Sequence, residues 1–288
     1  MKFMTRMKTE RKIIESQDFS IIQQIEAETM NIYGMLCNDQ GNLQRAEHFF
    51  CKSLKIREGL FGMNHSEVAK SLNNLGSLYE KMGEIKKAEN FYGKSLKIRL
   101  KLFGEFHCDV ASSLNNLGCL YDNSGNLAKA EEYYLRSLKI GRGLFGENHC
   151  DVATGLNNLG VLYYNMGKMS NAEVFYLKSL KIRQNLFGEE NSDVATSVNN
   201  LGILYQNKGN LEKAKEFFLR ALKIREGLFG EKNLDVAVSY NNLSCYYEEI
   251  GNRQLALNFA HKAYKITIVL LGKTHPLTVK YSGRCDRI

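Results

Sequence analysis

This sequence of 288 residues is nearly free of proline and lacks tryptophan. Pro276 is the single proline, and there is no tryptophan. Proline breaks helix interiors because its ring removes a backbone hydrogen bond, so a chain almost free of it can hold many closely spaced helices. Hydrophobic residues make up 44% and charged residues 24% of the sequence, which is typical of a folded chain and excludes intrinsic disorder.

The sequence also lacks the signals of disulfide pairing, membrane insertion and secretion. Its seven cysteines are odd in number and include no Cys-x-x-Cys motif, which favours a reducing compartment. No apolar run approaches the roughly 20 residues that cross a bilayer. Residues 1–26 contain several basic residues but no continuous apolar stretch, so no signal peptide is predicted there. We therefore expect a cytoplasmic protein.

Basic residues outnumber acidic ones by 39 to 31, which gives a formal net charge of +8. Such a surplus can indicate nucleic acid or an anionic membrane surface as the partner. Here the lysines and arginines recur at regular intervals instead of forming one cluster. Nucleic acid is therefore not the expected partner.

The sequence does contain one pattern six times, at a spacing of 42 residues. Its clearest copy reads Leu-Asn-Asn-Leu-Gly-x-x-Tyr from Leu72, then Ala-x-x-x-Tyr from Ala88 and Ser-Leu-Lys-Ile-Arg from Ser95. A fixed period of this kind predicts a solenoid, in which each unit contacts its neighbours and ligands bind along an extended surface. The other copies start at four later positions and, in a worn form, at one earlier position: Leu114, Leu156, Val198, Tyr240 and Met30.

Apolar residues within one copy follow the period of an α-helix. Val68, Leu72 and Leu75 fall on one face of a first helix, helix A, which is predicted to end at Gly83. A second helix, helix B, follows and is predicted to continue to Phe103 before Gly104 ends it. A small residue stands at the same place in every helix B, as expected where two helices approach closely: Ala46, Ala88, Ala130, Ala172, Ala214 and Ala256.

A histidine or asparagine precedes each later helix A and is predicted to be its N-cap. Pro276 supports this register, because proline is favoured at the first helical position. His107-Cys108-Asp109 contains metal-ligand residue types, but the equivalent positions hold Asn191-Ser192, and zinc needs about four convergent ligands. No metal site is therefore predicted.

These motifs resemble the tetratricopeptide repeat, which has Leu/Trp-x-x-Leu-Gly-x-x-Tyr in helix A and Ala-x-x-x-Phe/Tyr in helix B. The long 42-residue form, with Asn-Asn-Leu, Leu-Lys-Ile-Arg and Gly-x-x-His-x-Asp-Val-Ala, resembles the repeats of kinesin light chains and of nephrocystin-3. The resemblance covers about residues 27–279. Kinesin light chains also carry a long heptad segment before their repeats. Residues 1–26 hold no sustained heptads, so a role in a kinesin motor is expected only if this sequence is a fragment of a longer chain.

The resemblance implies an all-α fold, a right-handed superhelix of six tetratricopeptide helix pairs with terminal capping helices. Residues 27–272 are expected to form the six repeats, and residues 273–288 a partial capping helix. Residues 1–26 are expected to form a capping or disordered segment, because a terminal repeat otherwise exposes its stacking face. The apolar residues expected to cover that end of the stack are Ile13, Ile14, Phe19, Ile21, Ile22 and Ile25.

The Asn-Asn doublets of helix A are the candidate ligand contacts, since an asparagine amide both donates and accepts hydrogen bonds. In the kinesin light chains that these repeats resemble, the second Asn contacts a cargo peptide. A Lys four residues earlier and the Arg that ends Leu-x-Ile-Arg assist it. The resemblance therefore assigns peptide binding to Asn74, Asn116, Asn158, Asn200, Asn242, Lys70, Arg57, Arg99, Arg183 and Arg225. The alternative reading is that one Asn of each doublet hydrogen-bonds the neighbouring repeat and meets no ligand.

The sequence contains no phosphate-binding loop, nucleophile motif or paired-carboxylate arrangement, so neither catalysis nor a cofactor is expected. The leading hypothesis is a scaffold or adaptor that binds a peptide segment of a partner protein in its concave groove. The alternative is a structural or assembly component that associates through its basic outer face or through the ends of the stack. Nothing in the sequence indicates an oligomeric state.

Overall fold

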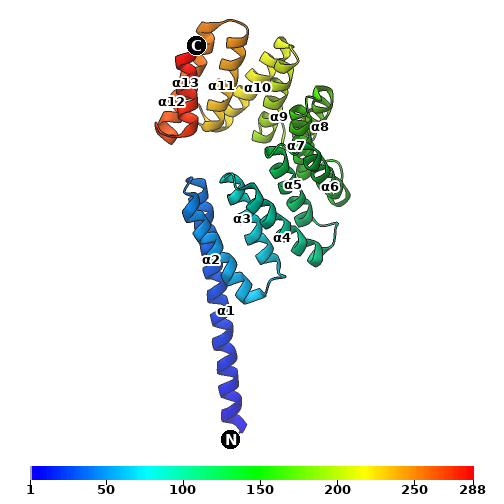
Figure 1. The fold of residues 1–288 in the computed structure, drawn as a ribbon, viewed down its shortest axis with the longest axis vertical. Helices are drawn as coiled ribbons and strands as arrows, with labels where there is room; N and C mark the ends of the chain where they lie inside the picture. The colour runs from blue at the N-terminus through cyan, green and yellow to red at the C-terminus, as the bar shows by residue number, and fades with distance from the viewer. Residues whose placement is uncertain (1) are drawn as a thin grey trace. The chain divides into compact units, whose positions relative to one another are not determined.

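The computed structural model describes residues 2–288, with side chains from Ser20 onward, and these residues form thirteen helices and no strand (Figure 1). The predicted all-α fold of helix pairs is confirmed. Odd-numbered helices from α1 to α11 correspond to helix A and even-numbered helices to helix B. The helices are α1 (Lys2–Asp39), α2 (Leu43–Phe61), α3 (Ser66–Lys81), α4 (Ile85–Phe103), α5 (Cys108–Asn123), α6 (Leu127–Phe145), α7 (Cys150–Asn165), α8 (Met169–Phe187), α9 (Ser192–Asn207), α10 (Leu211–Phe229), α11 (Leu234–Glu249), α12 (Arg253–Leu271) and α13 (Pro276–Arg287).

The helices form two compact units, Met1–Leu144 and Phe145–Ile288. In the first unit α1 packs on α2 and α3 on α4, while α2 also contacts α3 and α4 contacts α5. The second unit repeats this arrangement from α7 to α12 and ends with α13 packed on α12. Within each unit, these helices thus contact mainly their neighbours along the chain, as expected for a stack of repeats.

Close approach of helix A to helix B depends on the glycine of the Leu-Gly motif. A Cβ atom added at Gly76 would lie 2.5 Å from the ring of Tyr92 in α4, and one added at Gly202 would lie 2.7 Å from the ring of Phe218 in α10. Because real Cβ atoms do not approach other atoms so closely, only glycine lets the aromatic ring lie against the backbone of helix A.

The helix ends follow the predicted pattern. Gly83 and Gly104 have φ values of 77° and 76°, a left-handed backbone conformation that favours glycine and stops the helix before it. Nδ1 of His107 accepts a hydrogen bond from the backbone N–H of Asp109 over 3.1 Å, which caps α5. Pro276 is the first residue of α13. The predicted N-caps and helix-ending glycines are confirmed.

The first helix continues without a break from Lys2 to Asp39, so the expected boundary at residue 26 does not coincide with a helix end. Ile21, Ile22 and Ile25 lie on this helix and are more than half exposed. The side chains of Ile13, Ile14 and Phe19 lie outside the described residues. Among the described residues, no helix has the length and apolar character needed to cross a membrane.

Candidate functional site

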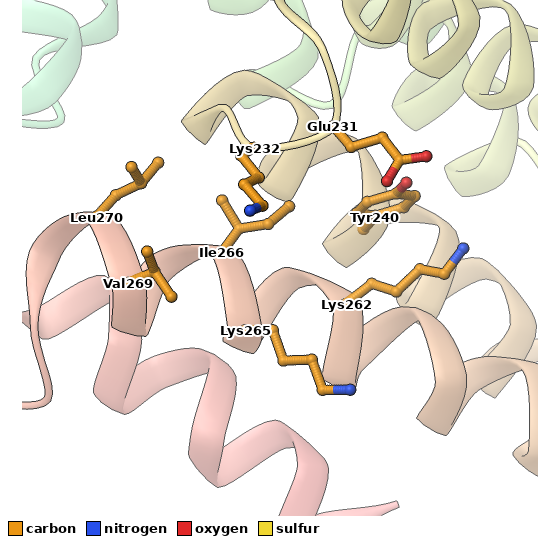
Figure 2. Close-up of a pocket in the computed structure, with 8 residues that line it drawn as sticks. All are labelled: Glu231, Lys232, Tyr240, Lys262, Lys265, Ile266, Val269 and Leu270. Carbon is orange, nitrogen blue, oxygen red and sulfur yellow. The ribbon is translucent and has the colours of Figure 1, made fainter.

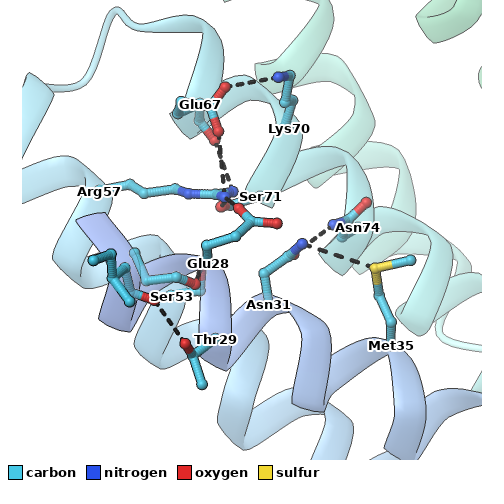
Figure 3. Close-up of polar contacts among 12 residues, drawn as sticks. Glu28, Thr29, Asn31, Met35, Ser53, Arg57, Glu67, Lys70, Ser71 and Asn74 are labelled. Carbon is cyan, nitrogen blue, oxygen red and sulfur yellow. Dashed lines mark hydrogen bonds and ion pairs between the residues drawn. The ribbon is translucent and has the colours of Figure 1, made fainter. Parts of the chain in front are cut away.

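Within each of the two units, asparagine side chains connect helix A to the helix A of the preceding repeat. Nδ2 of Asn74 in α3 donates a hydrogen bond to Oδ1 of Asn31 in α1 over 2.8 Å (Figure 3). In each case the second Asn of a doublet is the donor, and the acceptor lies 43 residues earlier. We call this set of bonds the asparagine ladder. Its other bonds join Asn116 to Asn73 (2.9 Å), Asn200 to Asn157 (3.0 Å) and Asn242 to Asn199 (2.7 Å).

The two sides of the ladder differ in burial. Three of the four acceptors are buried, namely Asn31, Asn157 and Asn199, whereas the acceptor Asn73 and the donors, such as Asn200 and Asn242, are half-buried. An asparagine amide has two N–H groups and a carbonyl oxygen. The ladder bond of Asn242 uses one N–H and leaves its Oδ1 without a donor among the described residues. The second Asn therefore bonds the neighbouring repeat, as the alternative reading predicted, and keeps capacity for a ligand.

Lys70 lies on α3 one turn before Asn74, and its side chain is exposed. Its ammonium group lies 2.7 Å from Oε1 of Glu67 (Figure 3). Partial burial raises the pKa of Glu67, but the hydrogen bond from Lys70 and the nearby charge of Arg57 outweigh it and bring the pKa below its usual value. Lys70 thus places a cation one turn from Asn74 and neutralises the carboxylate of Glu67, and its contact with a peptide stays a prediction.

The four predicted arginines lie inside the stack of helices. Arg57 in α2 is 4% exposed, and its Nη1 donates to Oγ of Ser71 in α3 over 2.8 Å (Figure 3). The same group bonds the carbonyl oxygen of Glu67, and Nη2 is paired with Glu28. Each arginine therefore holds helix B of one repeat against helix A of the next. The equivalent bonds to serine are Arg99–Ser113 (2.8 Å), Arg183–Ser197 (2.8 Å) and Arg225–Ser239 (2.7 Å).

Burial lowers the pKa of Arg99, Arg183 and Arg225, because a charged group is less stable away from water. The carbonyl and hydroxyl oxygens of the next helix A compensate for this lost hydration. The guanidinium groups are therefore already engaged within the protein. The peptide contact predicted for the arginines stays a prediction, and their contact with the neighbouring repeat is an additional role.

The serines that receive these arginine bonds were not among the predicted residues. The signal for them is present in the sequence. A serine stands 14 residues after each arginine, and where Gly141 takes the arginine position, Gly155 takes the serine position. Both members of the pair are thus lost together. This loss falls in the repeat where the chain divides into its two units, between Leu144 and Phe145.

The His-Cys-Asp triplets have the geometry of helix caps. The potential ligand atoms of His107, Cys108 and Asp109 lie within 4.8 Å of one another. However, Nδ1 of His107 accepts the backbone N–H of Asp109, and its ring stacks on Phe103 with ring centroids 4.2 Å apart. A lone pair that already accepts a hydrogen bond is not available to a metal ion. The geometry therefore favours the cap that the sequence predicted.

The chain belongs to the tetratricopeptide repeat family, whose model matches residues 25–101, 67–143, 109–185, 151–226 and 193–268. Proteins of this family are typically interaction scaffolds. Among solved structures, the chain is similar to BtubC (BKLC) from P. vanneervenii, with 26% sequence identity and a TM-score of 0.63. This similarity covers 88% of the present chain and 94% of BtubC.

Two further structures share the fold at lower sequence identity. The TPR-like repeats of a putative kinesin light chain from Podosopora anserina are 19% identical, with a TM-score of 0.59, and cover 72% of this chain and 98% of that one. The Rap protein complexed with Competence and Sporulation Factor is 17% identical, with a TM-score of 0.64. This similarity covers 91% of the present chain and 74% of the Rap protein. No curated protein matches the chain as a relative. The resemblance to tetratricopeptide proteins of the kinesin light chain type is thus confirmed at the level of fold and repeat.

Proposed function

We propose that this chain is a non-catalytic scaffold that holds extended segments of a partner protein along the part of the asparagine ladder in each unit. The observation that carries the proposal is the half-buried second Asn, such as Asn242, whose carbonyl oxygen accepts no bond from the described residues. The Rap protein, which shares the fold, was solved in complex with the Competence and Sporulation Factor. A ligand-binding role on this fold is consistent with that complex. The free thiols of all seven cysteines favour a cytoplasmic location.

The spacing of the ladder suits an extended chain. Packed helices lie about 8–10 Å apart, and an extended peptide advances about 3.3 Å per residue. One asparagine per repeat could therefore bond the backbone of about every third residue. Lys70 would add one cationic contact in the first unit. We assign the four buried arginines to positioning helix A through their serine partners.

The test compares two variants that break the same ladder bond. Asn242→Ala removes the half-buried donor, and Asn199→Ala removes its buried acceptor. A binding peptide is first selected from a random peptide library with the wild-type chain. Its affinity for both variants is then measured by fluorescence anisotropy, and folding is checked by circular dichroism and thermal melting.

Of these two residues, Asn242 is half-buried and has an unbonded carbonyl oxygen, whereas Asn199 is buried. The proposal therefore expects Asn242→Ala to lose about tenfold in affinity, roughly one hydrogen bond, while Asn199→Ala binds almost as well as the wild type. Equal losses in the two variants would show that the bond between Asn242 and Asn199 only stabilises the stack. Equal retention of affinity would place the peptide elsewhere on the protein.

A further inference from the structure

A hollow of about 310 Å³ lies in the second unit, between α12 and the loop that precedes α11 (Figure 2). The loop contributes Glu231 and Lys232, and α12 contributes Lys262 and Lys265 to its rim. We call it the C-terminal hollow. It lies apart from the asparagine ladder, because its lining comes mainly from helix B and the loop and not from the doublets of helix A.

The same hollow occurs one repeat earlier, with a volume of about 360 Å³. Each residue of that earlier hollow lies 42 residues before one in the C-terminal hollow. The two hollows are therefore a property of the repeat, and they differ only in side chains. The earlier hollow is lined by Glu189, Glu190, Arg220, Lys223, Ile224, Gly227 and Leu228.

The two hollows differ in the charge of the residues that line them. In the earlier one, Arg220 is ion-paired with Glu189, and two acidic and two basic residues balance. The hydrogen bond from Arg220 lowers the pKa of Glu189, as expected for a tight pair. In the C-terminal hollow, Lys232 replaces an acid, so three lysines face one glutamate. Among the described residues, none of these three lysines has a carboxylate partner.

One of these lysines is held in place. The ammonium group of Lys262 lies 5.1 Å from the ring centroid of Tyr240 and 5.7 Å from that of Phe259. The hydroxyl of Tyr240 donates a hydrogen bond to Glu226, which fixes the ring. A cation that rests on two aromatic rings is ordered before a ligand arrives, so it loses less conformational entropy on binding.

The other end of the hollow is apolar. Ile266 forms a buried wall, whereas Val269 is 74% and Leu270 46% exposed. Figure 2 shows these two side chains at one end and Lys262 with Tyr240 at the other. A ligand that fills the hollow would cover exposed apolar surface and meet unpaired positive charge at the same time.

We infer that the C-terminal hollow binds an acidic segment of a partner protein, with one bulky apolar side chain flanked by carboxylates. The apolar side chain covers Val269 and Leu270, and the carboxylates meet Lys262 and Lys265. Complementary charge raises the association rate and selects acidic partners, and the interaction weakens as salt increases. The balanced charge of the earlier hollow disfavours the same ligand.

The test uses two libraries of short synthetic peptides with Leu, Ile or Phe at the centre. Aspartate and glutamate flank the centre in one library, and lysine flanks it in the other. The proposal expects the wild-type chain to select acidic peptides, with weaker binding at higher salt. The double variant Lys262→Glu, Lys265→Glu should then lose about tenfold or more in affinity.

The earlier hollow provides the matched control. Arg220→Glu with Lys223→Glu changes the net charge by the same amount at the equivalent positions and should leave affinity unchanged. Val269→Ser tests the apolar contact with little risk to folding, because that side chain is already exposed, and it should weaken binding without lowering the melting temperature. Asn242→Ala, which is expected to weaken binding along the ladder, should leave the affinity for the acidic peptide unchanged, so the two sites can be told apart.

Several results would overturn the inference. These are equal selection of both libraries, equal losses in the two charge-reversed variants, or full affinity in Val269→Ser. Displacement of the bound acidic peptide by a single-stranded oligonucleotide would instead assign the hollow to phosphate.

Discussion

Nη1 of Arg183 in α8 lies 2.8 Å from Oγ of Ser197 in α9, and both side chains are buried. The same group also donates to the carbonyl oxygen of Asp193 over 3.0 Å. The pair joins consecutive repeats, and it uses an arginine that sequence resemblance assigns to ligand binding.

Arg183→Ala is expected to destabilise the chain by about 2–3 kcal/mol, because it removes charge-assisted hydrogen bonds and leaves buried oxygens unpaired. Lys181→Ala, an exposed neighbour on the same helix, should change stability little. Urea unfolding measures both. A variant that replaces both partners, Arg183→Met with Ser197→Ala, should recover much of the loss, since the buried hydroxyl of Ser197 is then not left without its donor. Normal stability of Arg183→Ala with weakened peptide binding would favour the ligand role instead.

The second prediction concerns the contact between helix A and helix B. Gly202→Ala would place a methyl group 2.7 Å from the buried ring of Phe218 and is expected to cost about 1–3 kcal/mol. Gly93→Ala is the control, because a Cβ there meets no atom within 4 Å and the residue lies in the interior of α4. That control should gain about 0.5–1 kcal/mol from helix propensity. Similar effects of both substitutions on the melting temperature would contradict this account of close packing.

Much of the fold could be predicted because the same local pattern occurs in six copies, which can be compared position by position. The end of helix B at Phe103, the glycine that follows it and the caps at His107 and Asn191 are local features, and six copies report them independently. Local sequence governs helix ends through backbone conformation and hydrogen bonds within a few residues.

The partners of the site residues could not be predicted in the same way. The doublets were recognised as polar positions of helix A, but the bond from Asn74 to Asn31 depends on the offset between helices in two repeats. The burial of Arg57 against Ser71 likewise depends on where α2 meets α3. The sequence pattern of one helix predicts on which face of that helix a residue lies. It does not predict which atom of the neighbouring repeat the residue contacts.

The third prediction concerns the stability of the folded state at low pH. Glu173 in α8 accepts hydrogen bonds from Lys208 and from the hydroxyl of Tyr205, and these bonds, with that from Lys208 the stronger, lower its pKa from the usual 4.5. A carboxylate with a lowered folded-state pKa stabilises the fold fully above its unfolded pKa, and this stability is lost as pH falls through the folded value. The loss is therefore expected below about pH 4.5.

Glu173→Gln removes the titrating group and keeps an oxygen acceptor for Tyr205. Melting temperatures of the wild type and the variant should differ most at neutral pH, and the difference should shrink as the pH falls below 4.5. Parallel melting curves over the whole acidic range would show that the contacts of Glu173 with Lys208 and Tyr205 do not stabilise the folded state.

The last prediction concerns the helix caps and separates capping from metal binding. Nδ1 of His107 and Oδ1 of Asn191 accept the same backbone N–H at equivalent positions, over 3.1 Å and 2.7 Å. His107→Asn should therefore keep stability within about 0.5 kcal/mol, while His107→Ala should lose about 1 kcal/mol with the cap. Zinc added to the wild type should not raise the melting temperature, because Nδ1 is already bonded to the chain. A rise that His107→Asn abolishes would identify a metal ligand in place of a cap.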